Sequence, residues 1–141
     1  SYQRQLAQYE KATDLDALTN ILNRKGLFEK IEQSVAEARR NSISLSVALF
    51  DIDNFKRIND SYGHLAGAAL LQQIAKLLSI DDASYCARLG GEEFILVMPE
   101  KSPSAAAQTA KAAVAPGGAP AGGFRLQYGH AGATFCQMQR S

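Results

Sequence analysis

Residues 85–98 read YCARLGGEEFILVM, and they carry the strongest structural signal in the sequence. Two apolar, strand-like segments flank Gly90 and Gly91, which predicts a β-hairpin, because glycine reaches the positive φ values that tight turns need. The tip then carries two adjacent carboxylates, Glu92 and Glu93. Neighbouring acids repel each other and folding does not require them, so they indicate a bound cation.

A second acidic turn follows another predicted strand. Residues 44–50 are rich in apolar side chains and end at Asp51, Ile52 and Asp53. If this strand lies beside the hairpin, Asp51 and Glu92 can share a divalent ion. Oxygen ligands of this kind suit Mg²⁺, or Mn²⁺, which takes its other ligands from water and from substrate phosphates. Two ordinary acidic turns remain the alternative interpretation of these residues alone.

Three motifs resemble the GGDEF family of diguanylate cyclases. They are DALTNILNR at 16–24, DIDNFKRINDSYGH at 51–64 and RLGGEEF at 88–94, in the family's order and spacing. The resemblance implies an α+β fold with a mostly antiparallel central sheet flanked by helices, similar to the palm of nucleotidyl transferases. It assigns 14–141 to the GGDEF domain and 1–13 to a linker or to the end of a signalling helix.

The chemistry that the resemblance implies is the condensation of two GTP molecules into cyclic di-GMP with release of pyrophosphate. The 3′-hydroxyl of each nucleotide attacks the α-phosphorus of the other, so two domains must meet and catalysis requires a homodimer. An upstream sensor domain is the expected partner in the full-length protein. These expectations place the domain in the cytoplasm.

The family's functional positions are carried over onto this sequence residue by residue. They are Asp51, Glu92 and the Ile52 carbonyl for the metal; Glu93, with Glu92 and Asp51, for catalysis; Phe55 and Lys56 for the triphosphate; Asn59 for the guanine base; and Gly90 and Gly91 for close approach of the α-phosphate. Backbone amides at a helix start favour anions, which fits the triphosphate segment.

The base-binding position departs from the family pattern. Family members usually carry Gly-Asp where this chain has Gly67 and Ala68, and that aspartate accepts hydrogen bonds from guanine. Alanine accepts none, so selectivity for guanine over adenine is expected to be relaxed.

Two further departures concern regulation and the end of the domain. Residues 81–84 read DDAS and lack the Arg-x-x-Asp motif of the family's product-inhibition site, so feedback through this site is not expected. The family's C-terminal helix has no counterpart before Ser141, which indicates either a shortened sequence or a degenerate domain. Ala68 and this missing helix favour a second hypothesis, in which a degenerate domain binds a nucleotide or a protein without catalysis.

The composition agrees with one compact domain. The 141 residues are 46% hydrophobic, and 15 basic and 14 acidic residues give a net charge of +1. This mixture offers no electrostatic case for a nucleic-acid polymer or an anionic membrane. No signal peptide and no membrane-spanning run is predicted. Cys86 and Cys136 lack metal-ligand spacing, which indicates two buried thiols.

Apolar periodicity and end signals predict the remaining elements. We expect helices over 24–40, 54–62, 65–79 and 103–115, and a last strand over 124–135. The first of these helices is expected to bury Leu27, Phe28, Ile31, Val35 and Ala38 along one stripe.

Overall fold

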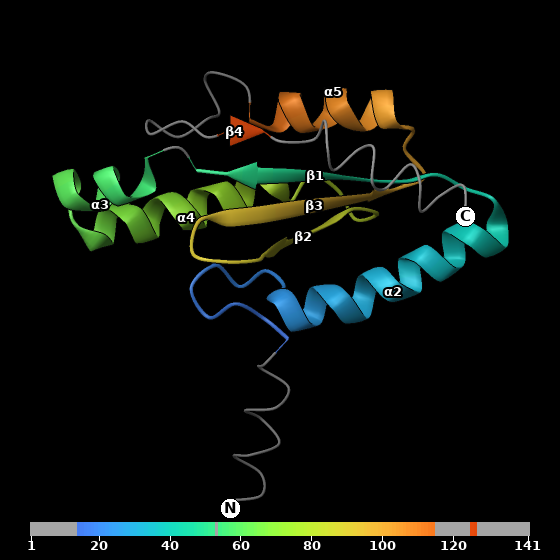
Figure 1. The fold of residues 1–141 in the computed structure, drawn as a ribbon, viewed down its shortest axis with the longest axis horizontal. Coiled ribbons are helices and arrows are strands. Elements are labelled where there is room, and N and C mark those ends of the chain that lie inside the picture. The colour runs from blue at the N-terminus through green and yellow to red at the C-terminus, as the bar shows by residue number, and fades with distance from the viewer. Residues whose placement is uncertain (1–13, 53, 115–124, 127–141) are drawn as a thin grey trace, which may run out of the picture.

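The computed structural model describes residues 14–52, 54–114 and 125–126. Helices and strands are interspersed along the chain, and Figure 1 shows helices on both sides of one sheet. The elements are α2 (Arg24–Asn41), β1 (Leu45–Asp51), α3 (Phe55–Tyr62), α4 (His64–Leu78), β2 (Tyr85–Arg88), β3 (Glu93–Pro99), α5 (Pro103–Ala113) and β4 (Arg125–Leu126). The predicted α+β class is confirmed. The segment 1–13, Cys136 and all of the predicted last strand except β4 lie outside the described residues.

The four described strands form one sheet in the order β2-β3-β1-β4, and every neighbouring pair is antiparallel. β2 and β3 form the predicted hairpin, and β3 then pairs along the whole of β1. This register places Asp51, the last residue of β1, opposite Glu93, the first residue of β3.

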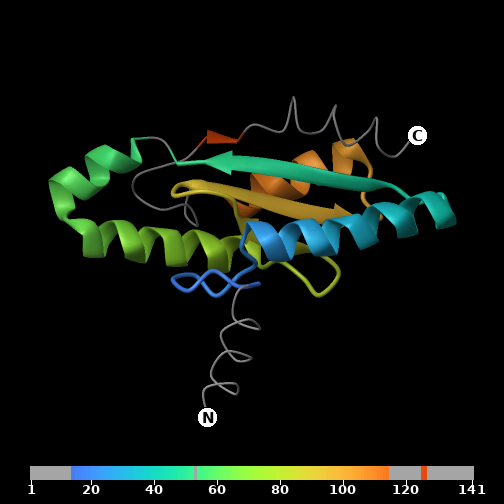
Figure 2. The ribbon, with the colours of Figure 1, turned by 60° about the horizontal axis from the view of Figure 1, so that its bottom comes forward.

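The two faces of the sheet bury two hydrophobic clusters, because successive side chains of a strand point to opposite faces. Ala48 and Phe50 of β1 belong to the cluster that includes α4 and α5. Leu45 and Val47 belong to the cluster that includes Leu27 of α2. Figures 1 and 2 show α2 and α5 on opposite sides of the strands.

The helix ends follow the sequence signals. Ser102 caps α5 by accepting a hydrogen bond from the Ala105 amide, and Pro103 occupies the first turn. Gly63 separates α3 from α4 with φ of 92°, a conformation that favours glycine.

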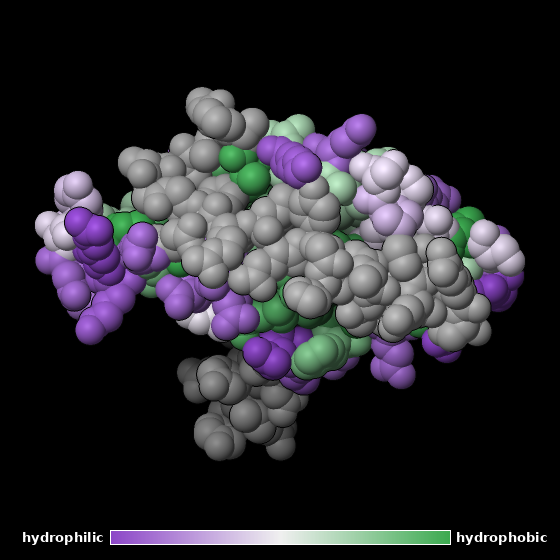
Figure 3. All heavy atoms as spheres, turned by 45° about the horizontal axis from the view of Figure 1, so that its top comes forward, coloured by the Kyte–Doolittle hydropathy of each residue, from purple (hydrophilic) through white to green (hydrophobic). Residues whose placement is uncertain are grey.

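Figure 3 shows hydrophilic side chains gathered at the α3 end of the molecule. None of the described helices is long and apolar enough to cross a membrane.

The predicted apolar stripe of α2 is wrong at one position. Leu27 and Ala38 are buried, but Phe28 is 55% exposed in the described structure. Successive helical residues are about 100° apart, so Phe28 lies at the margin of the stripe, and its side chain stays exposed there. Cys86 is buried, as predicted.

Candidate functional site

The acidic residues of the two predicted turns lie together at one end of the sheet. Asp51 and Glu93 are register partners across β1 and β3. One position beyond, the Ile52 amide donates a hydrogen bond of 3.2 Å to the Glu92 carbonyl. Asp51 and Glu92 are half-buried, whereas Glu93 is exposed. The pairing of β1 with β3 therefore brings these three acids to one sheet edge.

The hairpin turn differs in detail from the expected tight turn. Its loop comprises residues 89–92, and the Leu89 amide donates to the Glu93 carbonyl at 2.8 Å. Gly63 has a positive φ, but neither Gly90 nor Gly91 does, so the expectation that this turn needs left-handed glycines is wrong. A four-residue loop reverses the chain without them. Glu93 consequently lies in β3, and only Glu92 remains on the loop.

The two glycines leave space beside these acids. A Cβ atom added at Gly91 would meet nothing within 4 Å, and one added at Gly90 would first meet Glu93 Oε1 at an ordinary 3.5 Å. Neither backbone conformation nor packing within the described structure therefore requires glycine here. A requirement for glycine at these positions would come from a ligand that approaches the backbone closely.

A cavity of about 110 Å³ adjoins the acids. Its lining residues are Leu49, Phe50, Asp51, Leu89, Glu93 and Phe94. A larger cavity of about 460 Å³ lies between residues 18–21 and α4, and none of the predicted site residues lines it. Of these two cavities, only the smaller one is lined by predicted site residues, namely Asp51 and Glu93.

The oxygen ligands at this edge suit a magnesium ion that also binds phosphate oxygens. Among the described residues, no three His, Cys, Asp or Glu side chains gather closely enough to cage a metal. Asp51, Glu92 and the Ile52 carbonyl offer oxygen atoms only, which Mg²⁺ prefers to nitrogen or sulfur. Mg²⁺ commonly binds through one or two carboxylates plus phosphate oxygens. Such a site therefore needs only a few ligands from the protein.

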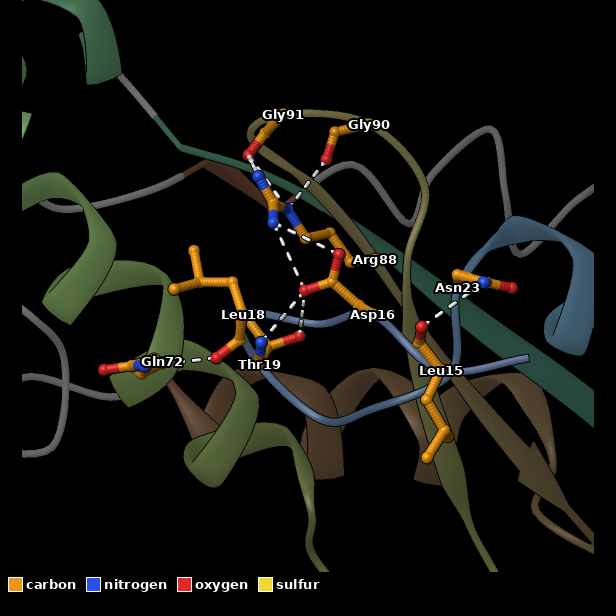
Figure 4. Close-up of polar contacts among 9 residues, drawn as sticks. All are labelled: Leu15, Asp16, Leu18, Thr19, Asn23, Gln72, Arg88, Gly90 and Gly91. Atoms are coloured by element: carbon orange, nitrogen blue, oxygen red, sulfur yellow. Dashed lines mark hydrogen bonds and ion pairs between the residues drawn. The ribbon is translucent and has the colours of Figure 1, made fainter. Parts of the chain in front are cut away.

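Arg88 ties the hairpin loop to the N-terminal part of the described chain (Figure 4). Its Nε and Nη2 atoms donate to the carbonyls of Gly90 and Gly91 at 3.0–3.3 Å. Its Nη1 atom donates to both carboxylate oxygens of Asp16 at 3.2 Å. Both side chains are 19% exposed, so this ion pair is largely shielded from water. The guanidinium thus fixes the carbonyls of the loop from one side.

Asp16 is itself held by Thr19 (Figure 4). The Thr19 amide and hydroxyl donate to Asp16 Oδ2 at 2.9 and 2.7 Å. Burial raises the pKa of Asp16, but the hydrogen bonds from Thr19 and the Arg88 guanidinium outweigh this and lower it. Gln72 of α4 donates to the Leu18 carbonyl at 3.1 Å and joins the same loop to the helix.

Sequence reasoning identified the motifs that contain these residues, yet assigned no role to Asp16 or Thr19. Arg88 belongs to the RLGGEEF motif, and the structure shows that it pairs with Asp16. The Asp-x-x-Thr spacing is a usable signal, because an aspartate commonly accepts from an amide two or three residues later.

The remaining predicted residues lie on α3 and α4, which pack against each other. Phe55 begins α3 and packs against the core, and Lys56 is exposed beside it. Asn54, the N-cap, makes no side-chain capping hydrogen bond, so it leaves amides at this helix start open to an anion. Asn59 and Ala68 are half-buried on α3 and α4 respectively. Asp53 lies outside the described residues.

Known proteins resemble this chain in sequence and in fold. The family model described as "Diguanylate cyclase, GGDEF domain" matches residues 13–117. Diguanylate cyclase DgcP of Pseudomonas aeruginosa is 46% identical over 95 residues, which cover 66% of this chain and 14% of that protein. The chain spans less than a third of the length of the curated relatives considered.

Solved structures share the fold. The active GGEEF domain of a diguanylate cyclase from Vibrio cholerae is 40% identical, with a TM-score of 0.62 over 64% of this chain and 60% of that one. The coiled coil and GGDEF domain of DgcB from Caulobacter crescentus, solved in complex with c-di-GMP, has a TM-score of 0.74. It covers 96% of this chain and 81% of that one at 24% identity, which is a likeness of fold alone.

Proposed function

Because this chain belongs to the GGDEF domain family of diguanylate cyclases, we propose that it condenses two molecules of GTP into cyclic di-GMP and releases two pyrophosphates. The observation that carries the proposal is the meeting of Asp51, Glu92 and Glu93 at one sheet edge, beside an open Gly90–Gly91 loop. Carboxylates next to accessible backbone suit a metal-bound triphosphate.

The proposed reaction consists of two identical substitutions. The 3′-oxygen of one GTP forms a bond to the α-phosphorus of the other, the bond between the α-phosphorus and the bridging oxygen breaks, and pyrophosphate leaves with the electron pair. The hydroxyl proton passes to a base. We assign this role to Glu93, because its carboxylate is exposed at the sheet edge. Repetition of this step with the roles of the two nucleotides exchanged closes the ring.

Divalent metal dependence is general in the family, and we assign the metal to Asp51, Glu92 and the Ile52 carbonyl. When bound, the metal neutralises phosphate charge and favours an ionised 3′-hydroxyl. The protein itself holds the oxygen ligands of the metal at fixed strand ends. It also leaves space beside the backbone of Gly90 and Gly91, where the substrate can approach. We assign Phe55 and Lys56, at the start of α3, to contact with the triphosphate.

Catalysis in this scheme needs a second copy of the chain. One domain holds one GTP, so the two nucleotides meet only when two domains face each other across a two-fold axis. We infer a homodimer that forms at least during turnover. In the full-length protein, an upstream sensor would then control activity by bringing two domains together or keeping them apart. Since GTP is a cytoplasmic nucleotide, we place the domain in the cytoplasm.

The base site supports a preference for guanine that is weaker than usual in the family. Asn59 is the remaining polar group assigned to the base, because Ala68 replaces the usual aspartate. The same observation favours a second candidate function, a nucleotide-binding signalling module without cyclase activity.

Mass spectrometry of the products separates the two candidates. The protein is incubated with Mg²⁺ and GTP, then with an equimolar mixture of GTP and ATP. Cyclic di-GMP and pyrophosphate are the expected products of GTP, and the mixture should also yield some mixed purine dinucleotide. A protein that binds GTP in the presence of Mg²⁺ but releases no pyrophosphate would be the signalling module instead.

A further inference from the structure

An unpartnered polar atom lies between α3 and α4. Asn59 Oδ1 is fully buried and makes no hydrogen bond. Among the described residues, Ser84 Oγ is the other buried side-chain atom without a hydrogen-bond partner. A buried acceptor without a donor destabilises the folded state, so the position of this amide calls for an explanation outside hydrogen bonding. Packing is the remaining way to hold it.

The packing partner is Gly67 of α4. A Cβ atom added at Gly67 would overlap Asn59 Oδ1 and would lie 2.8 Å from Asn59 Cγ and 3.3 Å from Asn59 Nδ2. Gly67 has no positive φ, since Gly63 is the glycine of that kind in the described structure. Its backbone would therefore accept alanine, and alanine favours a helix interior more than glycine does. The close approach of Asn59 is what requires glycine at this position.

The contact also orients the amide. Its oxygen faces the Gly67 backbone, while its nitrogen donates to none of the described residues and is not one of the buried unpartnered atoms. The amide nitrogen is thus left available to donate a hydrogen bond to a ligand. In the proposed function, that ligand is the base of the bound nucleotide, whose acceptor atoms would receive this hydrogen bond.

We propose that Gly67 is a positioning residue for nucleotide selection: its missing side chain lets the Asn59 amide lie against α4 with the nitrogen turned toward the purine base. The inference rests on the proposed function, in which Asn59 contacts the base. The position of Asn59 matters more for base selection in this chain, because the neighbouring Ala68 has no polar side chain.

A double-mutant cycle tests this coupling through stability and through binding. The four proteins are the native chain, Gly67→Ala, Asn59→Ala and the double variant, with Ala69→Gly at an exposed position of the same helix as the control for helix propensity. Binding is measured by calorimetry with Mg²⁺ and α,β-methylene-GTP, whose α–β linkage cannot be cleaved. Stability is measured as the melting temperature without nucleotide.

Gly67→Ala should weaken analogue binding at least tenfold and lower the melting temperature by several degrees. In the Asn59→Ala background, the same substitution should change binding less than twofold and should raise the melting temperature, because the new methyl then has room and favours the helix. If Gly67→Ala alone does not fold but the double variant does, the coupling is supported. If neither folds, the inference is wrong.

Two other outcomes overturn the inference and are distinguishable. If Gly67→Ala leaves binding unchanged while Asn59→Ala weakens it, Asn59 contacts the nucleotide without help from Gly67. If Asn59→Ala leaves binding unchanged although the two substitutions are coupled in melting temperature, the contact is structural and the assignment of Asn59 to the base fails. In neither case is the proposed cyclase reaction itself refuted, since product formation is measured separately.

Discussion

The proposed chemistry needs the negative charge of Glu92, whereas the fold does not need its side chain. It is half-buried on the hairpin loop, and its backbone carbonyl, which accepts from the Ile52 amide, supplies the described hydrogen bond. A substitution that retains the backbone and the side-chain shape therefore separates catalysis from folding.

We predict that Glu92→Gln lowers the rate of cyclic di-GMP formation by at least about 100-fold, because a neutral amide binds Mg²⁺ far less well than a carboxylate. The melting temperature should stay within about 2 °C of the native value, since the substitution retains the backbone and the shape of the side chain. Both are measured on purified protein. Glu32→Gln, an exposed position of α2, is the matched control, and near-native turnover in Glu92→Gln would refute the metal assignment.

Ala68 sets the expected base selectivity. An aspartate at this position of α4 would accept from guanine N1–H and the 2-amino group and would repel the lone pair of adenine N1. We predict that Ala68→Asp raises the preference for GTP over ATP by about 10- to 150-fold, equivalent to roughly 1.5–3 kcal/mol. Competition binding with both nucleotides checks this. If the native protein already rejects ATP several thousandfold and the variant is no different, position 68 does not face the base.

The β2–β3 loop depends on the N-terminal loop through one guanidinium. Arg88 bonds the carbonyls of Gly90 and Gly91 and pairs with Asp16, and only a planar fork reaches all three groups. We predict that Arg88→Lys lowers the free energy of unfolding by about 1.5–3 kcal/mol, the usual value of charged hydrogen bonds. Urea denaturation measures it. Lys25→Gln, which breaks an exposed ion pair with Asp14, should change it far less. Equal losses would mean that the Arg88 network does not stabilise the loop.

The same network gives a pH dependence. The pKa of Asp16 is lowered from its ordinary value of 3.8, so the folded state favours the carboxylate. The stability from this group is therefore present above about pH 4 and is lost as the pH falls through the lower folded-state pKa. Melting curves from pH 7 to pH 2 should show native protein and Asp16→Asn differing most at neutral pH and converging in acid. A constant difference would contradict this assignment.

The turn at residues 81–84 has a local structure of its own. Asp81 accepts from the Ser84 amide at 2.7 Å and lies 3.9 Å from Lys101, and these contacts lower its pKa. No arginine is available there to bind a cyclic dinucleotide phosphate. We predict that calorimetric titration of cyclic di-GMP finds no tight binding at this turn. A sub-micromolar site that Asp81→Ala or Ser84→Ala weakens would overturn the prediction.

Patterns of local origin were predictable from the sequence. The strands, the helix over residues 24–40 and the Ser102 cap follow from periodicity and end signals, which act over a few residues. The exposure of Phe28 and the absence of positive φ at Gly90 and Gly91 were not predictable. They depend on which neighbour covers a face and on how long the loop becomes, and both are tertiary properties.

The candidate site likewise combines residues that the sequence motifs predicted with contacts that depend on the fold of the whole molecule. The motifs marked Asp51 and Glu92, but only the pairing of β1 with β3 places them at one edge. The contact between Asn59 and Gly67 joins two helices, and the bond from Arg88 to Asp16 joins residues 72 positions apart. Such contacts require the fold itself.

Whether two copies of this domain together condense two GTP molecules can be measured through the rate of cyclic di-GMP formation as a function of protein concentration. With saturating GTP and Mg²⁺, and with product identified by mass spectrometry, the initial rate should rise with the square of protein concentration while the protein is mostly monomeric, and then become proportional to it. Absence of cyclic di-GMP at every concentration, under conditions where GTP is bound, would contradict the account.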